Sequence, residues 1–145
     1  MSTSAAIGRI ACEEIAQWLS QILADTYVLY LKTQNFHWNV TDARFHSLHE
    51  MFEQEYTELA ESVDLIAERI RMLKLKAPAS MRQFLKLTSL EESTEEMSGN
   101  DMIRALCHDR EALARYIRSK IEEVIKLGDQ GTGDLLIQQL RLHEK

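Results

Sequence analysis

Residues 35–70 read NFHWNVTDARFHSLHEMFEQEYTELAESVDLIAERI, and this stretch carries the clearest fold signal in the chain. Large apolar residues recur every three or four positions from Leu48 onward (Leu48, Phe52, Tyr56, Leu59, Val63, Ile66, Ile70 and Leu73). At about 100° per residue they fall within an arc of roughly 100°, which is typical of one helix face on a core. We therefore expect a helix over about residues 44–74, with Thr41 or Asp42 as its cap.

The same periodicity predicts four further helices on either side of this one. They cover residues 7–37, 81–87 and 101–127, with a last helix beginning at Asp134. Ser98 is the expected cap of the third long helix, Gly128 its end, and Thr132 the cap of the last helix. The acidic residues 91–96 read as a solvated loop in a long connection. The pattern predicts one domain over residues 1–145, an all-α four-helix bundle with a short helix in the crossover.

The composition excludes several classes of protein. The chain has 145 residues, 45% of them apolar, with one proline and five glycines, which favours a globular helical fold. No run of about 18 apolar residues is present, and the first residues lack the basic and apolar regions of a secretory signal. Cys12 and Cys107 give no disulfide framework. A net charge of −6 argues against a large DNA-binding surface.

A second stripe on the central helix has the composition of a metal site. His49, Glu53, Asp64 and Glu68 lie roughly 120° from the apolar stripe, and His46 shares their face. His49 with Glu53, and Asp64 with Glu68, stand one helical turn apart, so each pair covers one surface spot. Imidazole and carboxylate are ligands of first-row divalent metals. A solvated polar face has the same spacing, so the pattern alone leaves both explanations open.

The length of the helix decides how these pairs can cooperate. His49 and Asp64 are 15 residues apart, which is about 22 Å along a helix axis. Metal–ligand distances are about 2 Å, so one chain cannot bring both pairs to one ion. Two antiparallel copies related by a two-fold axis would bring His49 and Glu53 of one chain to Asp64 and Glu68 of the other, within reach of His37. No Glu-x-x-His motif occurs in the sequence, so a di-iron centre inside the bundle is not expected.

The same residues resemble the signature of the Dps family, the mini-ferritins. The matching elements are HWN at 37–39, Phe45, HEM at 49–51, a carboxylate at 53, DLIAER at 64–69 and GDQGTGDLL at 128–136. The resemblance covers about residues 15–145. It implies a ferritin-like bundle that assembles through two-fold dimers into a hollow homo-dodecamer in the cytoplasm. Such a shell oxidises Fe(II), preferably with hydrogen peroxide, stores Fe(III) mineral and protects against oxidative stress.

The resemblance also assigns roles to single residues. It implies that His37, His49 and Glu53 of one chain bind iron together with Asp64 and Glu68 of its neighbour. Trp38 would pack close to this ferroxidase site. Asp129 and Asp134 match positions that line an entry pore, although a turn residue and a helix-start carboxylate explain them equally well.

The sequence departs from the family pattern in three places. Glu53 stands where Asp is more usual, and the last helix ends earlier than usual, at Lys145. The first eight residues contain no Lys or Arg, so we do not expect the DNA binding, or the nucleoid association, that a basic tail gives some members. Two other functions remain open: a DNA-compacting stress protein with little ferroxidase activity, and a metal-binding protein that prefers zinc.

Overall fold

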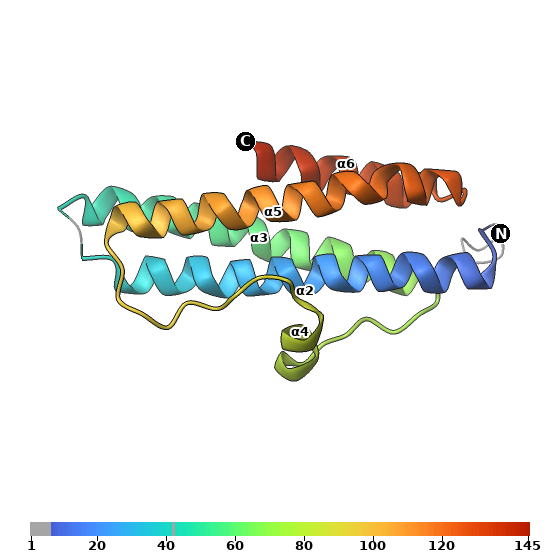
Figure 1. The fold of residues 1–145 in the computed structure, drawn as a ribbon, viewed down its shortest axis with the longest axis horizontal. Coiled ribbons are helices and arrows are strands. Elements are labelled where there is room, and N and C mark those ends of the chain that lie inside the picture. The colour runs from blue at the N-terminus through green and yellow to red at the C-terminus, as the bar shows by residue number, and fades with distance from the viewer. Residues whose placement is uncertain (1–6, 42) are drawn as a thin grey trace.

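The computed structural model describes residues 7–41 and 43–145, and this part of the chain contains helices and no strand. The helices are α2 (Arg9–Asn39), α3 (Phe45–Met72), α4 (Met81–Leu87), α5 (Gly99–Lys126) and α6 (Gln130–Glu144). Figure 1 shows α2, α3 and α5 running the length of the molecule, with the shorter α6 beside α5 and α4 in the crossover below α2. The predicted all-α bundle with a short helix in the crossover is confirmed.

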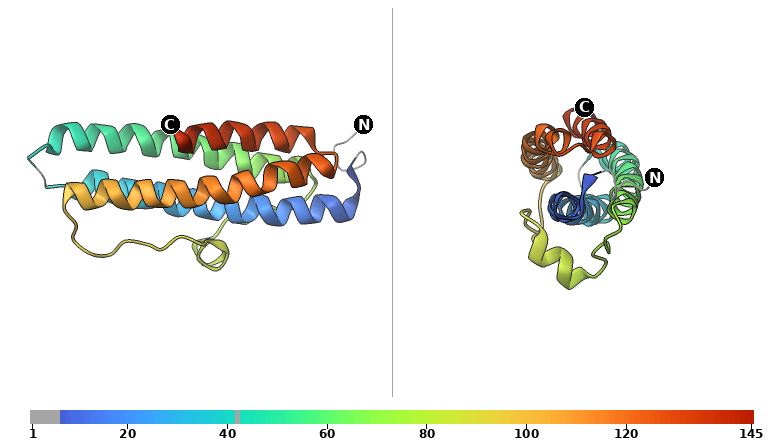
Figure 2. Two further views of the ribbon diagram at one scale, coloured as in Figure 1. Left: turned by 45° about the horizontal axis from the view of Figure 1, so that its top comes forward. Right: turned by 90° about the vertical axis from the view of Figure 1, so that its right-hand side faces the viewer.

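The helices pair as two hairpins. α2 packs mainly on α3, α5 packs mainly on α6, and α2 and α5 also touch. Seen end-on in Figure 2, α4 lies on the side of α2 that faces away from α6. Within the described residues, no helix combines the length and apolarity needed to cross a bilayer.

The apolar stripe of α3 faces the core as predicted. Leu48, Phe52, Leu59, Ile66 and Ile70 are buried, and the remaining members of the stripe are buried or half-buried. The rings of Phe52 and Phe36 of α2 lie 6.1 Å apart between centroids. Full burial of one such side chain contributes about 1.5–3 kcal/mol, so the stripe stabilises the packing of α3 on α2.

The boundaries of α2 and α3 differ from the prediction. α2 begins at Arg9 rather than residue 7, because Gly8 has a φ of 93°, outside the right-handed helical region. α3 begins after Arg44, whose side chain makes no capping hydrogen bond, so the expected cap at Thr41 is wrong. Asp42, the other expected cap, lies outside the described residues. α3 ends at Met72, two residues before the left-handed Lys74 with its φ of 69°.

The last hairpin confirms one cap and corrects another. Ser98 caps α5 by accepting a hydrogen bond from the Asp101 amide, and Gly128 leaves the helix with a φ of 90°, both as predicted. The cap of α6 is Asp129 rather than Thr132, so the helix begins four residues before the predicted start at Asp134. The Asp129 carboxylate accepts from the Thr132 amide at 2.9 Å, which explains the earlier start.

Two glycines that suggested a turn lie instead inside α6, where a side chain would not fit. A Cβ on Gly131 would lie 2.7 Å from the guanidinium of Arg69, and one on Gly133 would lie 2.8 Å from Ile125. The glycines therefore permit α6 to approach α3 and α5 closely.

A buried carboxylate fastens the crossover to the bundle. Asp25 of α2 is fully buried and accepts hydrogen bonds from the Thr88 hydroxyl at 2.6 Å and the Ser89 amide at 2.7 Å. Burial raises the pKa of Asp25, while the Thr88 and Ser89 hydrogen bonds lower it. Because residues 88 and 89 directly follow α4, this contact fixes where the short helix lies on α2.

A second buried group makes the stability of the fold depend on pH. His143 of α6 is 6% exposed, and its Nδ1 lies 3.3 Å from an Arg110 nitrogen, which donates to it. Burial, assisted by the positive charge of Arg110, lowers the pKa of His143 to about 3. The folded protein therefore holds this imidazole neutral at pH values where the unfolded chain takes up a proton.

Acidification below pH 6.5 is expected to destabilise the fold through His143. The contribution of the neutral ring is complete above the unfolded pKa and declines by about 1.4 kcal/mol for each pH unit below it, toward the folded pKa. Urea unfolding between pH 7 and pH 5 measures this slope. His143→Gln should flatten it, whereas His108→Gln, at an exposed position on α5, should leave it unchanged. Equal slopes in all three proteins would contradict the assignment.

Candidate metal centre

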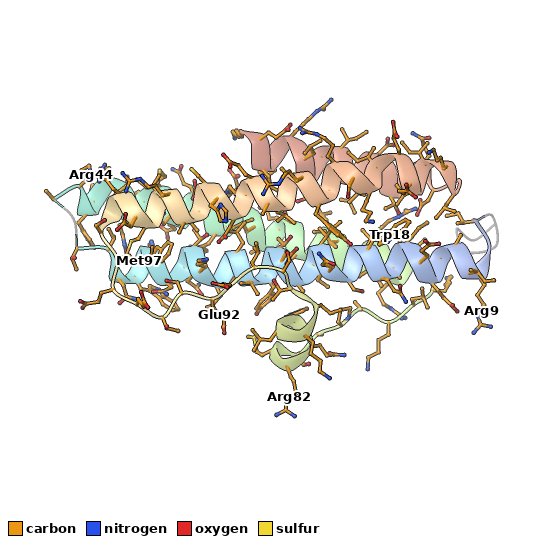
Figure 3. The ribbon with its side chains drawn as sticks, in the orientation of Figure 1. Arg9, Trp18, Arg44, Arg82, Glu92 and Met97 are labelled. Carbon is orange, nitrogen blue, oxygen red and sulfur yellow. The ribbon has the colours of Figure 1, made fainter. Side chains whose placement is uncertain are left out.

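Two of the predicted ligands meet where α2 passes into α3. His37 lies in the last turns of α2 and is buried, and His49 lies in the second turn of α3 and is half-buried. Arg44, labelled in Figure 3, marks this end of the molecule, where the connection reverses the chain direction. The reversal brings the two imidazole rings into a stack, with 3.7 Å between centroids and an interplanar angle of 15°.

The two histidines hold each other through reciprocal hydrogen bonds. Nδ1 of His37 lies 2.7 Å from the carbonyl oxygen of His49, and Nδ1 of His49 lies 2.7 Å from the carbonyl oxygen of His37. A carbonyl oxygen only accepts, so both Nδ1 atoms carry the proton. In the neutral rings the lone pair is then on Nε2, an arrangement common in metal-binding histidines.

Further aromatic rings surround the pair. The Phe45 ring stacks on His49 at 5.0 Å, and the Tyr56 ring meets His37 edge-on at 5.3 Å. These contacts restrict the orientation of both imidazoles, so their Nε2 atoms are fixed before any ion binds. Glu53 is exposed one turn beyond His49 on the same face of α3, which brings a carboxylate to the same side.

The other predicted ligands lie far from this pair. Asp64 and Glu68 are both exposed, one turn apart, in the second half of α3. The helix is unbroken from Phe45 to Met72, so the rise of about 22 Å between His49 and Asp64 holds in the structure. In the described part of one chain, no three His, Cys, Asp or Glu side chains gather closely enough to hold a metal ion. Each chain thus carries two separated groups of candidate ligands.

Trp38 lies beside the histidine pair in sequence but on another face of α2. Its side chain is 60% exposed, and it lines a groove of about 520 Å³ between α2 and α4. Leu31, Met81 and Leu85 also line this groove, and each is exposed. Contacts within one chain do not test the family-based expectation that Trp38 packs at the iron site, because that site would form between two chains.

The two candidate pore residues have different surroundings. Asp129 is 1% exposed, and its carboxylate is 2.6 Å from the guanidinium of Arg69 as well as capping α6. Asp134 is exposed on the first turns of α6. Asp129 therefore has a structural role, which agrees with its interpretation as a turn residue, whereas the carboxylate of Asp134 is exposed.

Sequence reasoning missed the contacts that organise the histidines. Residue types do not indicate that the peptide carbonyls of His37 and His49 would accept hydrogen bonds from the two rings. Tyr56 was assigned only to the apolar stripe. One signal was available: Tyr56 follows His49 by seven residues, about two turns, so both lie on the same side of α3.

Comparison with known proteins places the chain in a family. Residues 16–145 match the ferritin-like domain. A DNA protection during starvation protein of Bacillus anthracis is 34% identical over 86% of both chains, and a low temperature-induced protein of Nostoc is 39% identical over 88% of this chain and 72% of the relative. The structure of a Dps protein from Vibrio cholerae, described as one of the ferritin-like diiron-carboxylate proteins, superimposes with a TM-score of 0.91 at 30% identity, covering 94% of this chain and 86% of the other. The chain therefore belongs to the Dps family of ferritin-like proteins.

Proposed function

We propose that this protein is a ferroxidase that stores iron and protects against oxidative stress, working in the cytoplasm as a homo-dodecamer built from two-fold dimers. It oxidises Fe(II), preferably with hydrogen peroxide, and retains the product as Fe(III) mineral inside the shell. The observation that carries the proposal is the reciprocally bonded His37–His49 pair, because it prepares two Nε2 lone pairs on a surface that also presents a carboxylate, Glu53.

The iron site would be completed by a second copy of the chain. His37, His49 and Glu53 supply two nitrogen ligands and one oxygen ligand, and Asp64 and Glu68 of the partner subunit supply further oxygens. This mixed set suits Fe(II), and the oxygen ligands favour the harder Fe(III) product. Glu53 is one methylene longer than the Asp usual in the family, so its carboxylate reaches further from α3.

Exposed apolar side chains support a two-fold interface next to both groups of candidate ligands. Leu31, Trp38, Met81 and Leu85 line one groove and are 38%, 60%, 57% and 51% exposed. Leu65, adjacent to Asp64 on α3, is 48% exposed. Exposed apolar side chains gathered in a groove often mark interaction sites. Covering it with a second copy would also enclose the ligands, which strengthens their electrostatic interactions with the ion.

The electrons and protons of the proposed oxidation balance when two Fe(II) ions react with one hydrogen peroxide. One hydrogen peroxide accepts one electron from each of two Fe(II) ions, its O–O bond breaks, and two protons complete two water molecules. This pairing avoids release of hydroxyl radical. Asp134 is the carboxylate proposed to attract Fe(II) toward the shell, and the net charge of −6 favours cations in general. The same charge opposes DNA, so DNA binding is not part of the proposal, although relatives are named for DNA protection.

Rapid peroxide-driven oxidation of Fe(II) by the purified protein is the expected result. The measurement adds hydrogen peroxide to anaerobic protein loaded with Fe(II) and follows Fe(III) absorbance, with size-exclusion chromatography to establish the assembly. Pre-incubation with Zn(II) should inhibit the reaction, because zinc binds the same histidines and carboxylates. Oxidation no faster than in buffer by an assembled shell would contradict the proposal and leave DNA compaction or zinc binding as the function to examine.

A further inference from the structure

A row of tyrosine rings leads away from the candidate metal centre. The Tyr56 ring meets the His37 ring at 5.3 Å, Tyr30 meets Tyr56 at 5.8 Å, and Tyr27 meets Tyr30 at 5.7 Å, all between centroids. The row ends where Tyr27 stacks on Phe84 of α4 at 4.8 Å. It therefore runs from the histidine pair, through the contact between α3 and α2, to the crossover helix.

This row is made of tyrosine rather than phenylalanine until it reaches α4. The sequence contains four tyrosines, and three of them lie in it. Phenylalanine fills the neighbouring core positions 36 and 52, so aromatic packing alone does not require hydroxyl groups there. In the described part of the chain the Tyr56 hydroxyl makes no hydrogen bond, and Tyr30 only accepts a long one of 3.4 Å from Gln34. These hydroxyls thus contribute little to packing, whereas a phenol is one of the few side chains that gives up an electron readily.

We propose that Tyr56, Tyr30 and Tyr27 form an electron relay that supplies the second electron when peroxide meets a site holding a single Fe(II). The inference rests on the proposed ferroxidase function. The short ring-to-ring steps allow the oxidising equivalent to move from Tyr56, beside His37, to Tyr30 and Tyr27. On the half-buried rings of Tyr30 and Tyr27 the oxidising equivalent is held away from the iron site.

The electrons and atoms of this step balance. Fe(II) gives one electron and becomes Fe(III), and the tyrosine gives one electron and its hydroxyl proton, leaving a neutral tyrosyl radical. Hydrogen peroxide accepts both electrons, its O–O bond breaks, and with one further proton from solvent it leaves as two water molecules. A later Fe(II) returns one electron to the radical, and a solvent proton restores the phenol. The sum equals the two-iron reaction, so no other reductant is needed.

The test uses the assembled protein with about one Fe(II) per site and one equivalent of hydrogen peroxide. Samples frozen after mixing are examined by electron paramagnetic resonance for a tyrosyl radical, and a spin trap in parallel samples reports released hydroxyl radical. Tyr56→Phe keeps the ring but removes the oxidisable hydroxyl. Tyr116→Phe is the matched control, because Tyr116 lies on α5 under Lys120 and is the one tyrosine outside the row.

We expect a tyrosyl radical in the wild type and in Tyr116→Phe, and its loss to the iron-free background in Tyr56→Phe together with increased trapping of hydroxyl radical. A radical that survives Tyr56→Phe and disappears in Tyr116→Phe would overturn the relay, as would rapid Fe(II) oxidation with no radical in the wild type. Failure of the wild type to oxidise Fe(II) at all would instead refute the proposed ferroxidase function, so the two failures are distinguishable.

Discussion

Replacing Asp64 with Ala is expected to slow peroxide-driven Fe(II) oxidation about tenfold to a hundredfold or more, since even loss of a group that supports a ligand costs this much. The carboxylate is exposed on α3, where substitutions rarely disturb folding, so the variant should assemble. Initial rates of Fe(III) absorbance measure the effect. Glu122→Ala, at an exposed position on α5, is the matched loss of one surface carboxylate and should retain the wild-type rate.

Mixing two inactive variants tests whether the site is shared between chains. One variant carries His37→Ala and His49→Ala, and the other carries Asp64→Ala and Glu68→Ala. In a mixed two-fold dimer, one site loses both halves and the other keeps both halves intact. Random re-association should therefore restore about a quarter of the wild-type sites.

Two outcomes separate the alternatives in this experiment. Recovery of activity only after dissociation and joint reassembly supports a site between chains. No recovery, with mixed assemblies present by mass spectrometry, would contradict it, because a site within one chain cannot be repaired by a partner.

Removing the Asp129 carboxylate is expected to produce the largest loss of stability. Asp129→Ala would leave the guanidinium of Arg69, whose side chain is 16% exposed, without its partner at 2.6 Å. Breaking a buried ion pair in this way typically costs about 3–5 kcal/mol, and loss of the α6 cap adds to it. Urea unfolding and the melting temperature measure the change.

The matched control for this stability effect is Asp134→Ala, because Asp134 is an exposed carboxylate on the same helix. Its effect on the free energy of unfolding should stay within about 0.5 kcal/mol. Equal stability of the two variants would show that the Arg69–Asp129 pair does not hold α6 on α3.

The sequence was sufficient to predict the architecture because the spacing of apolar residues indicates which face of each helix is buried. The stripe on α3 predicted its buried face, Ser98 and Gly128 predicted the ends of α5, and the short helix was predicted over the residues at which it lies. The predicted helix boundaries were wrong where backbone or tertiary geometry determined them. Gly131 and Gly133 have the composition of a turn, yet they lie in a helix, at positions where a Cβ would crowd Arg69 and Ile125.

The candidate site was predictable only as a set of ligand types. Residue spacing paired His49 with Glu53 and Asp64 with Glu68, and the rise of the helix separated the two pairs. The orientation of the imidazoles depends on carbonyl oxygens brought together by the chain reversal after α2, which no side-chain pattern encodes. Likewise, the burial of Asp129 depends on Arg69, sixty residues earlier in the chain.

Because α3 is one rigid, uninterrupted rod, a newly synthesised subunit carries only halves of the proposed ferroxidase centre. Its chemistry then begins only after two subunits have met, and at low concentration the rate of formation of competent protein rises with the square of the subunit concentration. A subunit that fails to find a partner does not produce Fe(III) in open solution, where insoluble hydroxide would form. The length of α3 thereby confines Fe(II) oxidation to subunits that have already begun to assemble into a shell.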